Sequence, residues 1–252
     1  MSSNHIIVDH LTVKYHHQIA LNDVSFTVKK NIIFGIIGPA NAGKTTLLKC
    51  LNRTIDAEPG AKCSGSLRIN DTDVFHNSCD VIQLRHQIGM VFPLPVGLPL
   101  SVYENVAMAP RLQGIFDKQA LDEVVERSLR QAMLWDEVKD RLSQLGTRLS
   151  GGQQQRLTLA RAFSQNPKIL CLDEFSIAID PVTTMKIEDI LHEIKSRMTI
   201  ILVTSQVQQA RRLADFTTFM SRGHLIESGL TEKIYENPSH EMTRRYVCGE
   251  FG

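Results

Sequence analysis

The chain has 252 residues, 42% of them hydrophobic, which is enough to bury the core of one large domain or two small ones. Its 28 Lys and Arg nearly balance its 27 Asp and Glu, and a formal charge of +1 is not the basic excess that general nucleic-acid binders carry. The sequence has no secretory-signal pattern at its start and no run of about 18 apolar residues, so we expect neither a signal peptide nor a transmembrane helix.

The first part of the chain shows the patterns of β-strands. Alternating apolar and polar residues predict half-buried strands, and short apolar runs predict buried ones. Strands are expected at residues 8–13, 24–28, 32–37, 62–70 and 87–92. A helix is expected at residues 45–51, directly after the strand at 32–37. Prolines and a glycine follow residue 92 and break regular structure.

The middle of the chain changes to helical character, from residue 101 to residue 161. One apolar stripe at three- and four-residue spacing predicts an amphipathic helix packed on the core. Its members are Ala120, Leu121, Val124, Val125, Leu129 and Met133. Strands return at 169–172 and 199–203 with a helix at 181–195 between them, which favours a parallel sheet with right-handed crossovers. We therefore expect a helical block, at about 94–165, inserted into one domain that spans residues 1–252.

A phosphate-binding loop follows the buried strand at 32–37, with the pattern G-x-x-x-x-G-K-[ST]. Its residues are Gly38, Pro39, Ala40, Asn41, Ala42, Gly43, Lys44 and Thr45, and Thr46 continues the nucleotide-binding set. Backbone N–H groups would cradle phosphate oxygens at the start of the next helix. Lys44 supplies charge to the outer phosphates, and the Thr45 hydroxyl suits Mg²⁺. Asn41 tolerates a positive φ if the loop requires one. We expect this loop to bind MgATP.

Two carboxylates, Asp173 and Glu174, end the buried strand at 169–172. Taken alone, the pair could be a solvated turn. Ligands of open α/β sheets bind at the carboxyl ends of the strands, however, and a phosphate loop is present. Asp173 is therefore expected to bind Mg²⁺, and Glu174 to act as the general base on the water that attacks the γ-phosphate.

A second glycine-rich motif resembles the signature of ATP-binding cassette (ABC) ATPases. It comprises Ser150, Gly151, Gly152 and Gln153, preceded by Leu149 and followed by Gln154, Gln155 and Arg156. Ser150 is an N-cap candidate for the helix that follows. The resemblance implies that this motif completes the ATP site of a second subunit. It also implies adenine stacking on Tyr15, which alone would be a packing residue, and a dimer-contact loop containing Asp180.

The resemblance covers essentially the whole chain and implies an α/β P-loop NTPase fold of the ABC type. This fold has a mostly parallel sheet core, an antiparallel β subdomain and an inserted helical subdomain. Several stretches further resemble the ATPase subunits of bacterial phosphate importers. These are residues 134–140, 153–155, 208–211, 218–220 and 249–252.

The phosphate-importer resemblance implies an assembly at the cytoplasmic face of the bacterial inner membrane, where the chain is a peripheral protein. The implied partners are a second ATP-binding subunit, as a homodimer, transmembrane permease subunits and, indirectly, a periplasmic solute-binding protein. Nucleic acid is not an expected partner. Five scattered cysteines without a Cys-x-x-Cys pair are typical of a reducing cytoplasm.

Two positions depart from the family pattern. Pro93 stands where the family has a glutamine that senses Mg²⁺ and water, and Ser205 stands where it has a histidine that contacts the γ-phosphate. Proline has no polar side chain, and serine cannot carry an imidazolium charge. We therefore expect ATP binding with slow hydrolysis, unless a neighbour such as Gln206 substitutes. One alternative is a hydrolysis-deficient, ATP-gated regulator. Another is an ABC ATPase acting on nucleic acid or ribosomes, which the single cassette and the near-zero charge disfavour.

Overall fold

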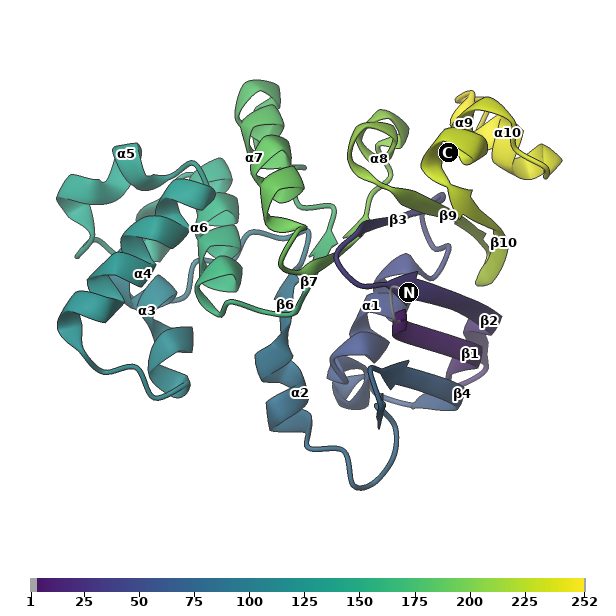
Figure 1. Ribbon diagram of the computed structural model, residues 1–252, viewed down its shortest axis with the longest axis horizontal. Coiled ribbons are helices and arrows are strands. Elements are labelled where there is room, and N and C mark those ends of the chain that lie inside the picture. The colour runs from purple at the N-terminus through teal and green to yellow at the C-terminus, as the bar shows by residue number, and fades with distance from the viewer. Residues whose placement is uncertain (1–3, 252) are drawn as a thin grey trace.

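The computed structural model describes residues 4–251, so Gly252, which ends the last of the importer-like stretches, lies outside the described residues. Figure 1 shows the arrangement of the elements. The strands are β1 (Asn4–Tyr15), β2 (Gln18–Lys29), β3 (Ile33–Ile37), β4 (Ala61–Ile69), β5 (Thr72–Asp73), β6 (Ile88–Val91), β7 (Ile169–Asp173), β8 (Thr199–Val203), β9 (Phe216–Ser221) and β10 (His224–Leu230).

Helices connect and cover these strands. The α-helices are α1 (Lys44–Leu51), α2 (Val81–Gln87), α3 (Val102–Leu112), α4 (Lys118–Gln131), α5 (Trp135–Val138), α6 (Gly151–Ser164), α7 (Pro181–Ile194), α8 (Val207–Leu213), α9 (Thr231–Glu236) and α10 (Glu241–Val247). Three short 3-10 helices are η1 (Thr54–Ala57), η2 (Lys139–Arg141) and η3 (Gly146–Arg148). Within residues 4–251, no helix combines the length and apolarity needed to cross a bilayer.

The larger sheet has six strands in the order β10-β9-β3-β8-β7-β6. The neighbours from β9 to β6 pair in parallel, and β10 pairs antiparallel with β9. The strands β3, β7 and β8 are buried along their whole length, as expected for a sheet covered on both faces. Because these strands are parallel, their carboxyl ends lie at one edge, and the candidate site forms there.

A smaller antiparallel sheet has the order β2-β1-β4-β5. The apolar side chains of α1 join one core with residues from both sheets, among them Leu48 of α1, Val13 of β1 and Ile36 of β3. The helix that follows the phosphate loop is therefore held between two sheets. The predicted combination of a mostly parallel sheet and an antiparallel β subdomain is confirmed.

The opposite face of the larger sheet packs against helices. A second core joins α3, α4, α6 and α7 with strand residues such as Leu170 and Leu202. Figure 1 shows α3 to α6 gathered on one side of the molecule, away from the β1-β2-β4 sheet. Three residues of the predicted stripe, Leu121, Val125 and Leu129, are buried in α4, but Met133 lies beyond the helix with φ +54°.

Two parts of the chain differ from the sequence-based expectation. The strand expected from residue 87 begins at Ile88, because Gln87 ends α2, whose N-cap Asp80 accepts hydrogen bonds from the N–H groups of Ile82 and Gln83. No helix or strand is expected from the sequence after residue 204, where the structure has α8, β9, β10, α9 and α10.

Candidate functional site

The phosphate loop lies between β3 and α1, as the pattern predicted. Gly43 has φ +96°, and a Cβ there would lie 2.5 Å from the Ala20 carbonyl oxygen, so only glycine fits. Asn41 has φ +60°, which confirms that the loop uses the left-handed tolerance of asparagine. Residues 41–46 line an open cavity of about 160 Å³.

Lys44 is folded back over this loop. Its Nζ donates hydrogen bonds to the carbonyl oxygens of Gly38 (2.6 Å) and Pro39 (2.9 Å), and the residue is only 8% exposed. Burial lowers the pKa of Lys44, and the carboxylates of Glu174 and Asp173 oppose that shift. The loop carbonyls thus fix one positive charge over the cradle.

The Thr45 hydroxyl donates a hydrogen bond of 2.6 Å to Oδ2 of Asp173, which joins α1 to the end of β7. Asp173 is 1% exposed, and burial raises its pKa while the Thr45 hydrogen bond opposes the rise. A hydroxyl and a carboxylate oxygen in contact form the kind of donor set that Mg²⁺ takes together with waters and phosphate oxygens. Among residues 4–251, no group of three or more His, Cys, Asp or Glu side chains is arranged for a metal. Thr45 and Asp173 supply two oxygen donors that would fit Mg²⁺ if a phosphate ligand and waters completed its coordination.

Glu174 follows directly at the end of β7 in a left-handed conformation, with φ +48°. Its N–H donates to the Val203 carbonyl oxygen (2.9 Å), and its Oε1 accepts a hydrogen bond of 2.6 Å from the Ser205 N–H. The general-base candidate is therefore anchored to the end of β8 through backbone groups. An unusual backbone conformation held by its surroundings is common at functional sites.

Pro93 and Ser205, the two positions that depart from the family pattern, lie at the same edge of the sheet. Pro93 comes two residues after the end of β6, and Ser205 comes two residues after the end of β8. The Gln206 amide donates to Ser176 Oγ (3.4 Å), so its side chain is engaged with the loop after Glu174. The structure therefore gives no support to Gln206 as a substitute for the missing polar groups.

Tyr15 ends β1 beside the phosphate-loop helix. Its hydroxyl donates to the Thr46 hydroxyl at 3.5 Å, and its ring packs against the core between the two sheets. The residue is half-buried, which leaves part of the ring accessible. This places the expected adenine-stacking residue next to the nucleotide-binding set.

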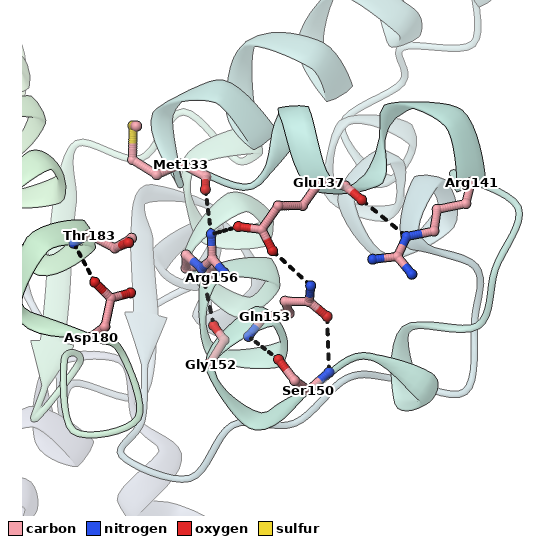
Figure 2. A network of polar contacts seen from close by, with 9 residues as sticks. All are labelled: Met133, Glu137, Arg141, Ser150, Gly152, Gln153, Arg156, Asp180 and Thr183. Atoms are coloured by element: carbon pink, nitrogen blue, oxygen red, sulfur yellow. Dashed lines mark hydrogen bonds and ion pairs between the residues drawn. The ribbon is translucent and has the colours of Figure 1, made fainter.

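The signature motif starts α6. Ser150 is its N-cap, and a reciprocal capping box joins it to Gln153: the Gln153 N–H donates to Ser150 Oγ (3.4 Å), and the Ser150 N–H donates to Gln153 Oε1 (3.0 Å) (Figure 2). This confirms the predicted cap. The backbone of Gly152 passes close to the next loop, since a Cβ there would lie 2.7 Å from the Ala178 carbonyl oxygen.

Asp180 caps α7, where its Oδ1 accepts a hydrogen bond of 2.9 Å from the Thr183 N–H (Figure 2). The signature and the expected dimer-contact loop are therefore adjacent in one subunit. Glu137, to which no role was assigned from the sequence, forms an ion pair with Arg156 of the signature motif. The signal was present in the importer-like stretch at 134–140.

The comparisons with known proteins agree with this geometry. The family model described as "ABC transporter" matches residues 21–176. The chain is 44% identical over 247 residues to the phosphate import ATP-binding protein PstB of Thermotoga maritima, covering 98% of both chains. It is also 44% identical to PstB 1 of Vibrio parahaemolyticus, covering 98% of this chain and 91% of that one.

Solved structures show the same fold at lower identity. The chain resembles cbiO1 from Clostridium perfringens, described as part of the ABC transporter complex cbiONQ, with a TM-score of 0.78, 23% identity and coverage of 93% and 91% of the two chains. It also resembles the dimeric ATP-binding cassette MJ0796 bound to ADP and Pi, with a TM-score of 0.79, 24% identity and coverage of 90% and 98%. The chain belongs to the ABC transporter family and has the fold of its ATP-binding subunits.

Proposed function

We propose that this chain is the ATP-binding and ATP-hydrolysing subunit of an ABC importer of inorganic phosphate. The observation that carries this proposal is the contact between Thr45 and Asp173 at 2.6 Å, which joins the phosphate loop to the carboxylate strand. Phosphate as the cargo is supported by the relatives, which are named as phosphate import proteins, and not by any residue of the site. Those names also disfavour the alternative of a hydrolysis-deficient regulator.

The residues of one subunit bind ATP in the following way. Backbone N–H groups of residues 40–46 cradle the phosphates at the start of α1, Lys44 contacts the outer phosphates, and Tyr15 stacks on the adenine. Thr45 and Asp173 hold Mg²⁺, which when bound neutralises phosphate charge. The Glu174 carboxylate, anchored by the Ser205 N–H, orients the attacking water and accepts its proton.

A second copy completes each site. The N-terminal turn of α6 presents the Ser150 hydroxyl and the unpaired N–H groups of Gly151 and Gly152, which suit a phosphate across an interface. Gln153 supports this turn from within the capping box, and Asp180 ends the neighbouring contact loop. The dimeric state described for MJ0796 supports this arrangement. ATP-driven closure of the homodimer then moves the permease, and hydrolysis resets it.

A groove beside β6 is the surface that we assign to the permease. It has a volume of about 360 Å³ and is lined by residues of α2, β6, α3 and α6, with the exposed apolar side chains of Ile82 and Leu112 among them. Arg161 at its edge donates to the Val96 carbonyl oxygen (3.3 Å), which ties the loop after Pro93 to the groove. The occupant is a cytoplasmic segment of a transmembrane permease subunit at the inner face of the cell membrane, with a periplasmic solute-binding protein acting on the other side.

Turnover should be slow. Loss of one positioned polar group in a transition state commonly costs about 10²–10³ in rate, and Pro93 and Ser205 remove two. The polar contacts at Gln206 do not replace them.

The test is co-purification of the tagged chain with its permease from membranes, followed by ATPase and phosphate-uptake assays on the complex. Glu174→Gln is the matched blank. ATP-dependent phosphate uptake that the blank lacks supports the proposal. A complex that hydrolyses ATP without phosphate uptake would remove the cargo assignment, and a chain that binds no membrane protein would remove the importer assignment.

A further inference from the structure

The importer-like stretch at 134–140 contains the short helix α5, and its Glu137 lies against the start of α6 (Figure 2). Glu137 Oε2 accepts a hydrogen bond of 2.7 Å from the Gln153 Nε2, and Oε1 accepts one of 2.5 Å from the Arg156 Nη1. One carboxylate therefore accepts hydrogen bonds from two residues of the signature helix that are three positions apart. Charge-assisted hydrogen bonds of this kind are stronger than neutral ones.

The contact with Gln153 continues to the signature serine. While the Gln153 Nε2 donates to Glu137, its Oε1 accepts from the Ser150 N–H at 3.0 Å, and its own N–H donates to Ser150 Oγ. Because Ser150 Oγ is the acceptor in this cap, the hydroxyl proton remains free to donate to an anion. Glu137 thus fixes which way the Gln153 amide faces, and through it the donor arrangement at Ser150.

The contact of Glu137 with Arg156 stabilises the same turn of α6. Arg156 has a side chain only 9% exposed, and it also donates to the carbonyl oxygens of Met133 (2.5 Å) and Gly152 (3.4 Å). The hydrogen bond from Arg156 holds the pKa of Glu137 below its ordinary value; burial opposes this and Gln153 reinforces it. A carboxylate facing a nearly buried guanidinium stays ionised at neutral pH, so protonation of Glu137 does not break these contacts under working conditions.

The position of α5 is itself fixed by packing. Leu134 and Val138 are buried in the helical core, and Trp135 lies under the Arg130 guanidinium at 5.3 Å from the ring centroid. The backbone carbonyl of Glu137 also accepts a hydrogen bond of 3.0 Å from Arg141 Nε. The neighbouring Asp136, in contrast, is 84% exposed and faces only Lys139 at 3.8 Å.

We propose that Glu137 is a positioning residue for the signature motif and that it acts in trans, on the nucleotide bound to the phosphate loop of the opposite subunit. The inference rests on the proposed function, because it requires a composite ATP site. It predicts a defect that appears only across the dimer interface. A misplacement of about 1 Å in such a donor set can cost on the order of 10²-fold.

A mixed-dimer experiment separates action in trans from action in cis. One fluorescently labelled subunit carries only Glu174→Gln, which blocks hydrolysis and leaves an intact phosphate loop. Its labelled partner carries Lys44→Ala, alone or combined with Glu137→Ala or with Asp136→Ala. The partner cannot use its own loop, so MgATP can close the pair only through the partner's signature. Energy transfer between the labels reports the MgATP-driven association.

The expected result is association of the Lys44→Ala and Lys44→Ala/Asp136→Ala partners with equal affinity, and association weaker by about 10- to 100-fold for Lys44→Ala/Glu137→Ala. With Glu137→Gln in place of Glu137→Ala, the loss should be smaller, because the amide keeps one acceptor oxygen. In the chain with Glu137→Ala alone, MgATP binding to the monomer should match that of the parent within about twofold.

Four outcomes would overturn the inference. Equal association of the Glu137→Ala and Asp136→Ala partners would remove the role in trans. A loss of MgATP affinity in the Glu137→Ala monomer equal to the loss of association, or a Glu137→Gln chain that unfolds, would make Glu137 a purely structural residue. If MgATP brings together neither the mixed pair of Glu174→Gln with Lys44→Ala nor the Glu174→Gln homodimer, the chain forms no composite ATP site. In that case both the proposed function and the inference that rests on it are wrong.

Discussion

The backbone N–H of Ser205 donates a hydrogen bond of 2.6 Å to the carboxylate of Glu174. The contact uses no atom of the Ser205 side chain. It therefore survives the replacement of the histidine that the family has at this position, and it anchors the general-base candidate through the backbone at the end of β8.

The anchoring contact predicts opposite results for two substitutions of Ser205. Ser205→Ala keeps the N–H, so most of the low ATPase turnover should remain. Ser205→Pro removes the N–H and should lower single-turnover hydrolysis on the order of 10²-fold. MgATP affinity and the thermal unfolding midpoint serve as controls for a folded site. Equal turnover of the two variants would show that the contact does not position Glu174.

Restoring the missing polar groups should accelerate hydrolysis. The double substitution Pro93→Gln and Ser205→His supplies an amide and an imidazole at the carboxyl ends of β6 and β8, and turnover of the assembled complex should rise on the order of 10²-fold. The gain must vanish when Glu174→Gln is added, since both groups act with that carboxylate. An unchanged or lower rate would mean that slow turnover has another cause, and a wild-type turnover near 10 s⁻¹, the median of enzymes, would remove the expectation of slowness itself.

Asp173 should lower the stability of the nucleotide-free protein. Burial raises its pKa above the unfolded value, so the folded state binds the proton more tightly, and stability falls as pH rises from the unfolded pKa through the folded one. At pH 7 the Asp173→Asn variant should therefore melt at a higher temperature than the parent without ligand. It should also bind MgATP on the order of 10- to 100-fold more weakly, measured by titration with and without Mg²⁺. A variant that is less stable and binds equally well would contradict both roles.

His5 should make the fold sensitive to acid, in the opposite direction to the effect of Asp173. It is buried against Thr199, with its Nδ1 2.6 Å from the Thr199 hydroxyl. Burial, with the charges of Lys30 and Lys168, lowers the pKa of His5 to about 4. A lowered histidine pKa gives stability that is complete above about 6.5 and is lost as pH falls towards about 4. The unfolding free energy of wild type should thus fall more steeply over this window than that of His5→Gln, measured by urea unfolding; parallel pH profiles would contradict the assignment.

The sequence predicted the parts of the site that depend on local spacing. The phosphate loop, the buried strand ending in Asp173 and the cap at Ser150 each lie within a few residues, so a pattern can carry them. The contact of Thr45 with Asp173 spans 128 positions, yet it could be anticipated because parallel strands end at one edge.

Other contacts could not be predicted in this way. The hydrogen bonds that Glu137 accepts from Gln153 and Arg156 depend on how α5 packs beside α6. No periodic pattern in the local sequence predicts this packing. The strands β9 and β10 were not predicted because Thr217, Thr218 and Ser221 interrupt the apolar pattern of the stretch. The burial of β9 comes from its pairing with β3 and from the C-terminal helices, whereas β10 stays partly exposed. Tertiary contacts decided both cases.

This chain should bind MgATP on the loop over which Lys44 lies, and the decisive measurement is equilibrium binding of MgATP to the purified full chain and to Lys44→Ala. Lys44 lies over the cradle, held by the carbonyl oxygens of Gly38 and Pro39. We predict saturable MgATP binding to the parent and no detectable binding to Lys44→Ala. Thermal unfolding should show that both chains are folded. Micromolar binding retained by Lys44→Ala would show that Lys44 and its loop do not hold the nucleotide.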